Sequence, residues 1–338
     1  MKRRWSLYCL AFLAMLVGAR VGPAAAHGLI GQRFLPATLA TDDPFVADEL
    51  SLPTVFYQQM LGTGGTPRIK FTSLSGEFSK RLSPNLGLSL GGAWDVIAPQ
   101  GRPDDDNTKV LTGFENMDVT LKYVFFKSPA HEILLSAGFS WEIGGTGDHK
   151  KVGAEHFDHF TPKLYFAKGF GDLPEVLEWL KPIAVTGVFG WSVPNRVRTK
   201  TISVEPDTGD VNVDRDLNTE VFQWGFSTQY SLPYLQSFVR DIGLPAPFNR
   251  MIPLVELALQ TPLNGPRAGY TTGTVNPGII WFGRYFQLGI EAVIPINSAS
   301  GKNVGVIAQI HFYLDDIAPK IFTWTPFHGT LGPTQPPR

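Results

Sequence analysis

The sequence contains few charged residues, a single cysteine and no long apolar run. Asp, Glu, Lys and Arg make up 17% of the 338 residues, compared with about 25% in typical soluble proteins. Cys9 is the only cysteine, which excludes a scaffold held together by disulfides. After residue 26, no stretch is long and apolar enough for a membrane-spanning helix. These absences exclude a disulfide-rich domain and a helical membrane protein.

The first 26 residues have the three parts of a secretory signal peptide. A basic start at 2–4 precedes an apolar core at 6–18, and the alanine triplet at 24–26 forms a cleavage site. We therefore expect export of the chain and cleavage after Ala26. Without the four basic residues of this peptide, 25 basic side chains remain against 30 acidic ones, a net charge of about −5. This acidic balance argues against a nucleic-acid partner.

The remaining sequence alternates between apolar and polar residues in many short segments. Within residues 131–142, for example, every second residue from Ile133 to Trp141 is apolar. This period of two is typical of a strand that has one apolar and one polar face. In residues 68–79 the alternation changes phase by Leu74, which predicts a β-bulge there. We predict twelve strands, at 50–59, 68–79, 86–97, 112–126, 131–142, 160–168, 183–193, 222–230, 250–261, 273–282, 285–295 and 303–315.

The connections between these strands alternate in length. Short ones lie at 81–85, 127–130 and 283–284, and long polar ones at 98–111, 143–159 and 195–218. Short periplasmic turns, long outer loops and an even number of strands are typical of bacterial outer-membrane barrels. The sequence therefore predicts an all-β fold, a transmembrane antiparallel β-barrel of about 12 strands over residues 50–315. Its expected partners are the lipid bilayer and lipopolysaccharide of the outer membrane.

Aromatic residues provide a second indication of a membrane. Trp94, Trp141 and Trp191 fall at the predicted outer ends of strands, and Tyr123 and Phe166 near the opposite ends. Two such belts are favoured at the two membrane interfaces. The alternative is a soluble β-sandwich that has these aromatic residues in its core.

Four segments lie outside the strand pattern. Residues 27–49 are an irregular N-terminal segment, which we expect either to enter the lumen as a plug or to trail from the barrel, and residues 316–338 form a C-terminal tail. At 172–180 and 231–239, a proline precedes apolar residues that are three to four positions apart. This spacing predicts two short amphipathic helices on the periplasmic side.

Several segments resemble uncharacterised proteobacterial exported proteins. They are residues 33–49, 120–123 (TLKY), 136–141 (SAGFSW) and 169–174 (GFGDLP). Those proteins are similar in turn to an outer-membrane β-barrel family assigned to a phenol-degradation (MetA) pathway. The resemblance implies an outer-membrane barrel that passes aromatic or other apolar compounds, and it brings no catalytic or ligand-binding residues with it. Unlike many such barrels, the chain continues for 24 residues beyond Leu314.

Charged residues on the polar strand faces are expected to line the barrel lumen. Orientation toward lipid would cost roughly 2–4 kcal/mol for a Lys or Arg at the midplane, so the inward orientation is favoured. The excess of acids predicts a conduit that disfavours anions. The alternative is a set of ion pairs that fills and stiffens a narrow lumen. The candidate lumen residues are Lys70, Asp95, Asp118, Lys122, Glu132, Glu142, Lys163, Glu256, Glu291 and His311.

The sequence gives little support for a metal site or an enzyme. His149, His156 and His159 are the candidates for metal ligands, but their spacing in one outer loop matches no known site, so we predict a polar loop without metal. Acidic runs at 104–107 and 207–216 lack the spacing of an EF-hand loop. No G-x-S-x-G, H-E-x-x-H or P-loop motif occurs. We therefore expect no enzymatic activity and no cofactor.

Together these observations predict an outer-membrane barrel that allows passive passage of small, apolar or aromatic molecules. Two alternatives belong to other classes of protein. One is a closed barrel that acts in structure or adhesion through its extracellular loops. The other is a membrane-embedded lipid hydrolase, which would expose Ser and His on the lipid face.

Overall fold

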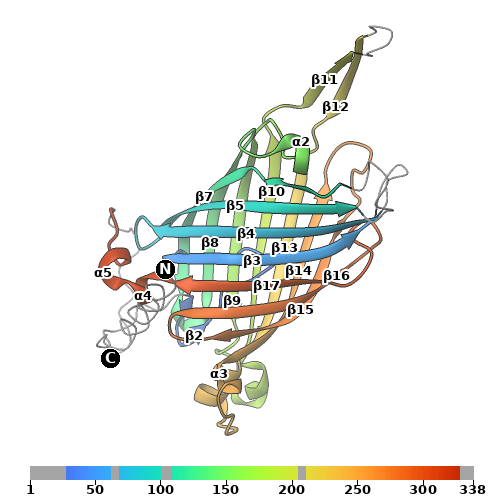
Figure 1. The fold of residues 1–338 in the computed structure, drawn as a ribbon. Coiled ribbons are helices and arrows are strands. Elements are labelled where there is room, and N and C mark those ends of the chain that lie inside the picture. The colour runs from blue at the N-terminus through green and yellow to red at the C-terminus, as the bar shows by residue number, and fades with distance from the viewer. Residues whose placement is uncertain (1–27, 62–67, 100–108, 205–210, 328–338) are drawn as a thin grey trace, which may run out of the picture.

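Thirteen strands of the computed structural model share one antiparallel sheet, which closes into a barrel (Figure 1). β6 (Leu111–Phe114) and β7 (Met117–Ser128) lie one after the other beside β5 (Leu86–Pro99), so the barrel wall has twelve strands. β3 (Glu49–Met60) pairs with β17 (Gly305–Tyr313) and closes the wall. The other wall strands are β4 (Ile69–Arg81), β8 (Ile133–Ile143), β9 (His159–Gly169), β10 (Ile183–Pro194), β13 (Val221–Tyr230), β14 (Met251–Pro262), β15 (Thr272–Phe282) and β16 (Phe286–Pro295).

The structure describes residues 28–61, 68–99, 109–204 and 211–327. The expected signal peptide and the acidic run at 104–107 lie outside these residues, as does part of the run at 207–216. Within them, the predicted all-β fold and the twelve wall strands are confirmed. Among the helices in these ranges, none is both long and apolar enough to cross a membrane.

The outer face of the barrel wall is predominantly apolar. Leu121 on β7 and Leu164 on β9 are exposed, whereas their chain neighbours Thr120 and Tyr165 are buried on the lumen side. Burial of one such leucine is worth roughly 1.5–3 kcal/mol relative to exposure in water, so the wall is far more stable against hydrocarbon. Other exposed apolar side chains on the wall are Leu74, Leu90, Tyr123, Phe139, Val255, Leu288 and Ile290.

Three aromatic pairs mark one end of the barrel. The strand register places Trp94 beside Phe114, Trp141 beside Phe160 and Trp191 beside Phe222. The first two pairs are in ring contact, with centroids 4.5 Å and 6.3 Å apart. Cross-strand aromatic pairs stabilise a sheet and are favoured at a membrane interface.

The two ends of the barrel differ in their connections. At the end with long connections, termed the loop end, β11 (Arg198–Val204) and β12 (Val211–Leu217) form a hairpin that extends beyond the barrel (Figure 1). The sequence predicted only a polar loop there. The opposite end, termed the turn end, carries most of the short helices, and three of these, η3 (Glu175–Leu180), α3 (Leu232–Tyr234) and η4 (Leu235–Val239), cover the two segments predicted to be helical. The other short helices are α2 (His149–Val152) at the loop end, and η2 (Pro129–His131), η5 (Phe248–Arg250), α4 (Leu314–Ile317) and α5 (Pro319–Phe322) at the turn end.

The predicted β-bulge in 68–79 is wrong. β4 pairs with β5 without interruption over all thirteen of its residues. The register shift lies in the neighbouring strand β3, between Ser51 and Thr54. The phase change has another cause: Phe71 is an apolar residue that faces the lumen, where its ring centroid lies 6.1 Å from that of Phe56.

Candidate functional site: the barrel lumen

Residues 28–48 lie inside the barrel and are termed the inner strap. The strap starts at the turn end with a small hairpin of β1 (Leu29–Ile30) and β2 (Arg33–Phe34). It then reaches the inner wall at Glu256, in the middle of β14. At Asp48 it is back at the turn end, next to Arg81 and the start of β3.

Apolar side chains hold the inner strap against the wall. Ile30 and Leu35 pack in one buried cluster with residues of β7 to β10, and Leu39 packs in a second with residues of β14 to β17. Glycines make room for this contact. A Cβ at Gly225 would lie 2.7 Å from Cγ2 of Thr41, and one at Gly289 would lie 2.5 Å from Cδ1 of Leu39. The wall is therefore shaped to fit the strap.

Glu256 binds three consecutive residues of the strap. Its Oε1 accepts a hydrogen bond from the backbone N–H of Leu39 at 2.8 Å. Its Oε2 accepts hydrogen bonds from the N–H of Ala40 at 3.1 Å, and from the N–H and hydroxyl of Thr41 at 2.7 Å each. Backbone groups of an irregular segment need such partners when they are buried. Glu256 is fully buried, and it supplies them.

Asp42 of the strap forms a cluster of charged and polar contacts with the barrel wall. Its carboxylate lies 2.8 Å from Nζ of Lys122 and 3.5 Å from Nζ of Lys163, and it accepts a hydrogen bond from the hydroxyl of Tyr165 at 2.8 Å. Burial alone would raise the pKa of Asp42, but the two lysines hold it well below its usual range. The strap is therefore bound to β7 and β9 by a charged cluster.

Three further ion pairs fix the strap at the turn end. Nε of Arg33 lies 2.7 Å from Oε2 of Glu132, and both side chains are buried. Glu132 adopts a φ of 49°, a left-handed conformation that is uncommon for a residue with a side chain. Asp48 bridges Nζ of Lys80 at 2.8 Å and Nε of Arg81 at 2.7 Å.

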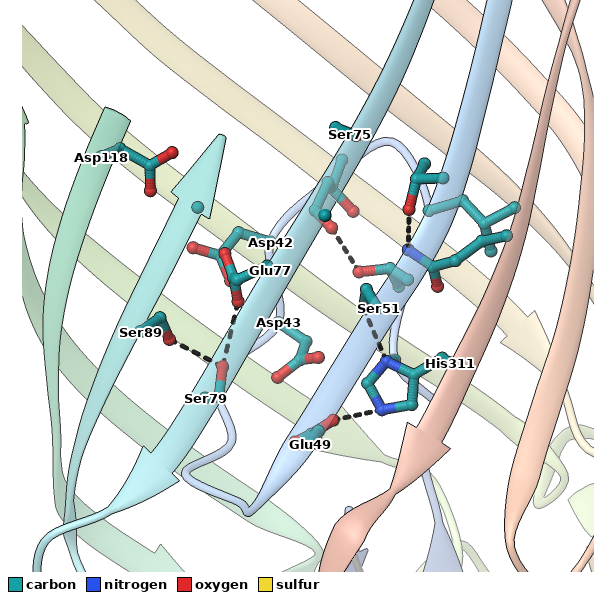
Figure 2. A pocket seen from close by; sticks show the side chains of 18 of the residues that line it. Asp42, Asp43, Glu49, Ser51, Ser75, Glu77, Ser79, Ser89, Asp118 and His311 are labelled. Atoms are coloured by element: carbon teal, nitrogen blue, oxygen red, sulfur yellow. Dashed lines mark hydrogen bonds and ion pairs between the residues drawn. The ribbon is translucent and has the colours of Figure 1, made fainter. Parts of the chain in front are cut away.

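A cavity of about 570 Å³, termed the main cavity, lies between the strap and the wall formed by β3, β4, β5 and β7 (Figure 2). Its lining runs from Glu115 near the loop end to His311 near the turn end. Many of the wall residues that line it are small, among them Ser75, Ser89 and Gly91. This volume is within the range of sites for small molecules.

Acidic groups dominate the lining of the main cavity. Burial raises the pKa of Asp43 on the strap to about 7, although Lys122 opposes the shift. Burial, a hydrogen bond that the protonated Glu115 donates to Asp95, and the negative charges of Asp95 and Glu142 raise the pKa of Glu115, in the break between β6 and β7, to about 7. The acidic lining residues are Asp42, Asp43, Glu49, Glu77, Glu115, Asp118 and Glu142.

A second cavity of about 380 Å³ lies on the other side of the strap. Asp42 and Lys163 line it together with Gln223 and Gln260. Asp42 therefore lies between the two cavities. The lumen is divided by the strap, and the larger part is on the side of β3 to β7.

The candidate lumen residues fall into three groups. Asp118, Lys122, Glu142 and His311 line the main cavity, and Lys163 lines the second. Glu132 and Glu256 hold the strap. Asp95 and Glu291 are buried in the wall, and in the part of the chain that the structure describes, Oδ1 of Asp95 and both carboxyl oxygens of Glu291 have no hydrogen-bond partner.

Lys70 does not belong with these residues. It is exposed and alternates along β4 with Phe71, on the face opposite to Ser75 and Glu77. The prediction placed Lys70 in the lumen because it relied on a bulge that β4 does not have. Lys70 pairs with Ala98 near the loop end, where its flexible side chain can reach the aqueous interface.

The three loop histidines do not converge on one point. The rings of His149 and His156 stack with their centroids 4.0 Å apart. His159 turns instead to Glu155 and to the hydroxyl of Ser192. Among the residues that the structure describes, no group of three metal-ligating side chains forms a site.

The acids of the strap and Glu77 of β4 were not among the lumen residues predicted from the sequence. Asp42 and Asp43 occur in an irregular segment, where no periodicity indicates a direction. Glu77 sits in the strand whose phase was misread. Arg33 gave no signal either, because its burial, and with it the need for an acidic partner, is visible only in the tertiary structure.

Solved structures similar to this chain are outer-membrane barrels. An outer-membrane channel from Pseudomonas putida F1 is 12% identical, with a TM-score of 0.50 and an alignment over 87% of this chain and 98% of that one. The transport unit of the autotransporter AIDA-I from Escherichia coli is 10% identical over 90% and 97% of the two chains, with a TM-score of 0.44. The β domain of the Bordetella autotransporter BrkA is 12% identical over 79% and 98%, with a TM-score of 0.44. No protein-family model and no curated protein sequence matches the chain.

The chain has the fold of an outer-membrane β-barrel. At 12% identity, the likeness to the Pseudomonas putida channel shows the shared fold alone.

Proposed function

We propose that this protein is an outer-membrane channel through which small solutes diffuse along the main cavity, beside the inner strap. The observation that carries the proposal is the cavity of about 570 Å³, whose lining extends from Glu115 near one end of the wall to His311 near the other. Ion pairs and apolar clusters fix the strap, and they leave this space open.

The proposed location is the outer membrane. The chain would be exported by its signal peptide, which would be cleaved after Ala26. The apolar outer wall and the aromatic pairs at the loop end support embedding in a lipid bilayer. The loop end would then face lipopolysaccharide, and the strap would enter the barrel from the periplasmic side. Export of the chain agrees with the basic and apolar pattern of residues 1–26.

The lining favours small hydrophilic solutes over the apolar or aromatic ones that the family resemblance implies. Serine hydroxyls at Ser75, Ser79 and Ser89 face the cavity together with several carboxylates (Figure 2). An apolar solute would have to remove water from these groups without replacing their hydrogen bonds, which is unfavourable. A role in a phenol-degradation pathway would therefore require another route through the barrel.

Solute flux into liposomes tests the proposed channel. The full chain, reconstituted in liposomes, should pass small sugars and amino acids faster than empty liposomes do. Ser75→Trp, which places a large side chain in the main cavity, should lower this flux several-fold. Leu74→Trp is the matched control, because Leu74 is the next residue along β4 and faces outward.

The outcome can contradict the proposal in two ways. Flux of the unmodified protein equal to that of empty liposomes would exclude a channel. Equal loss of flux in Ser75→Trp and Leu74→Trp would mean that solutes do not use the main cavity. Deletion of the β11–β12 hairpin should leave flux intact, whereas an adhesion barrel would lose its partner with that hairpin.

A further inference from the structure

We propose that the main cavity selects small cations, including organic ammonium ions, and excludes anions. The inference rests on the proposed channel and names the class of solute that it carries. Three features of the cavity support it: its cations are already paired, five of its acids are not, and one buried carbonyl oxygen in its lining has no hydrogen-bond donor among the described residues.

The cations in the lining are already neutralised. Nζ of Lys122 lies 2.8 Å from Asp42 and also donates a hydrogen bond to the backbone carbonyl of Asp43 at 2.6 Å. His311 contacts Glu49 with one ring nitrogen and the hydroxyl of Ser51 with the other. Neither Lys122 nor His311 therefore offers a free positive charge to an anion in the cavity.

Five acids of the lining have no cation of their own. In the part of the chain that the structure describes, none of them forms an ion pair with a Lys, Arg or His. Neutral groups donate to three of them: Ser79 to Glu77 at 3.1 Å, Asn116 to Glu142 at 3.0 Å, and the N–H of Phe45 to Asp43 at 2.9 Å. The five are Asp43, Glu77, Glu115, Asp118 and Glu142.

Gln309 is an independent sign that the cavity binds a hydrogen-bond donor. Its side chain lines the main cavity and is only 8% exposed. Its Nε2 donates to the hydroxyl of Thr54 at 3.0 Å, and its Oε1 has no partner among the described residues. A buried carbonyl oxygen without a donor is unfavourable. An ammonium group supplies N–H donors as well as a positive charge.

The acids follow the cavity rather than gathering at one point. Figure 2 shows Asp118 on β7, Glu77 on β4 and Asp43 on the strap facing the same space, and β5 lies between the two strands. A row of carboxylates between low-dielectric walls raises the local concentration of cations and repels anions. Because successive sites are spaced along the wall, a cation can move from one to the next.

Reversal potentials in planar bilayers test the selectivity. The full chain is measured under a KCl gradient and then under a choline chloride gradient. In both salts the cation-to-anion permeability ratio should exceed unity. Glu77→Gln combined with Asp118→Asn should move the ratio toward unity by roughly threefold in KCl, because two fixed charges leave the cavity. The matched control is Glu178→Gln, a half-buried acid on η3 outside the cavity.

The possible results separate the inference from the proposed function. Conductance with a ratio at or below unity overturns the inference and leaves the channel intact. If the double variant and the unmodified chain have equal selectivity, the selectivity comes from residues other than Glu77 and Asp118, and the inference is also overturned. Absence of any conductance, with the barrel folded by heat-modifiable gel mobility, overturns the proposed function itself.

Discussion

Replacement of Glu256 by alanine should release the middle of the inner strap from the barrel wall. Glu256 accepts four hydrogen bonds from Leu39, Ala40 and Thr41. Among the described residues, no other side chain accepts a hydrogen bond from these three N–H groups. The alanine variant removes the acceptor and leaves buried donors without partners.

The expected effect can be estimated from these contacts. A hydrogen bond to a charged group contributes about 1.5–3 kcal/mol, so the loss of only two of the four weakens the bound state of the strap by about 3–6 kcal/mol. Each 1.4 kcal/mol is tenfold in an equilibrium constant, so the released population should increase by at least about 100-fold. Glu256→Gln should have a smaller effect, because its amide keeps one acceptor oxygen.

Thiol labelling measures this release. Cys9 is the only cysteine and lies in the expected signal peptide, so Thr38→Cys introduces a single thiol into the mature chain. Thr38 is buried in the strap. Its cysteine should react slowly with a small methanethiosulfonate reagent in the parent and much faster in the Glu256→Ala background. Single-channel conductance should increase in parallel, since the strap occupies part of the lumen.

Ser140→Ala is the matched control for this experiment. Ser140 is a buried polar side chain of the wall like Glu256, but its hydroxyl is hydrogen-bonded to Thr120 on the neighbouring strand and not to the strap. Labelling should therefore be unchanged in Ser140→Ala. Equal labelling rates in the Glu256→Ala variant and the parent would refute the reasoning, because the apolar clusters alone would then hold the strap.

Three further predictions concern stability and pH. Arg33→Met should lower the free energy of unfolding by about 3–5 kcal/mol, because it leaves Glu132 buried without its cation; denaturant titration in detergent measures this, and an unchanged midpoint would contradict it. Leu164→Arg should cost about 2–4 kcal/mol in lipid vesicles if Leu164 lies near the midplane, and no cost would mean that this wall does not face hydrocarbon. Asp43 and Glu115, whose pKa values are about 7, are neutral below that pH and charged above it. Cation preference in bilayers should therefore increase from about pH 6 to pH 8, and a decrease would contradict the assignment of these acids to the cavity.

Strand positions were predictable because their signal is local. In β8, every second residue from Ile133 to Trp141 is apolar, and this alternation by itself requires one apolar and one polar surface. The same logic failed in β4, where Phe71 is apolar but faces the lumen. Alternation of residue types indicates only which face of a strand is polar. Assigning the polar face to the lumen assumes that the lumen is polar throughout. Where the strap packs against the wall, the lumen is apolar, so the assumption breaks down.

The sequence by itself determined the barrel. Each wall strand has lipid on one side and a polar lumen on the other, and its residues therefore alternate between apolar and polar with a period of two. Only the tertiary structure decided what fills the lumen and where it stays open. Leu39 and Glu256 are 217 residues apart in the chain, and the sequence around neither residue indicates their hydrogen bond. The main cavity exists because the strap binds β7, β9 and β14 on one side and leaves the serines and carboxylates of β4 and β5 uncovered on the other.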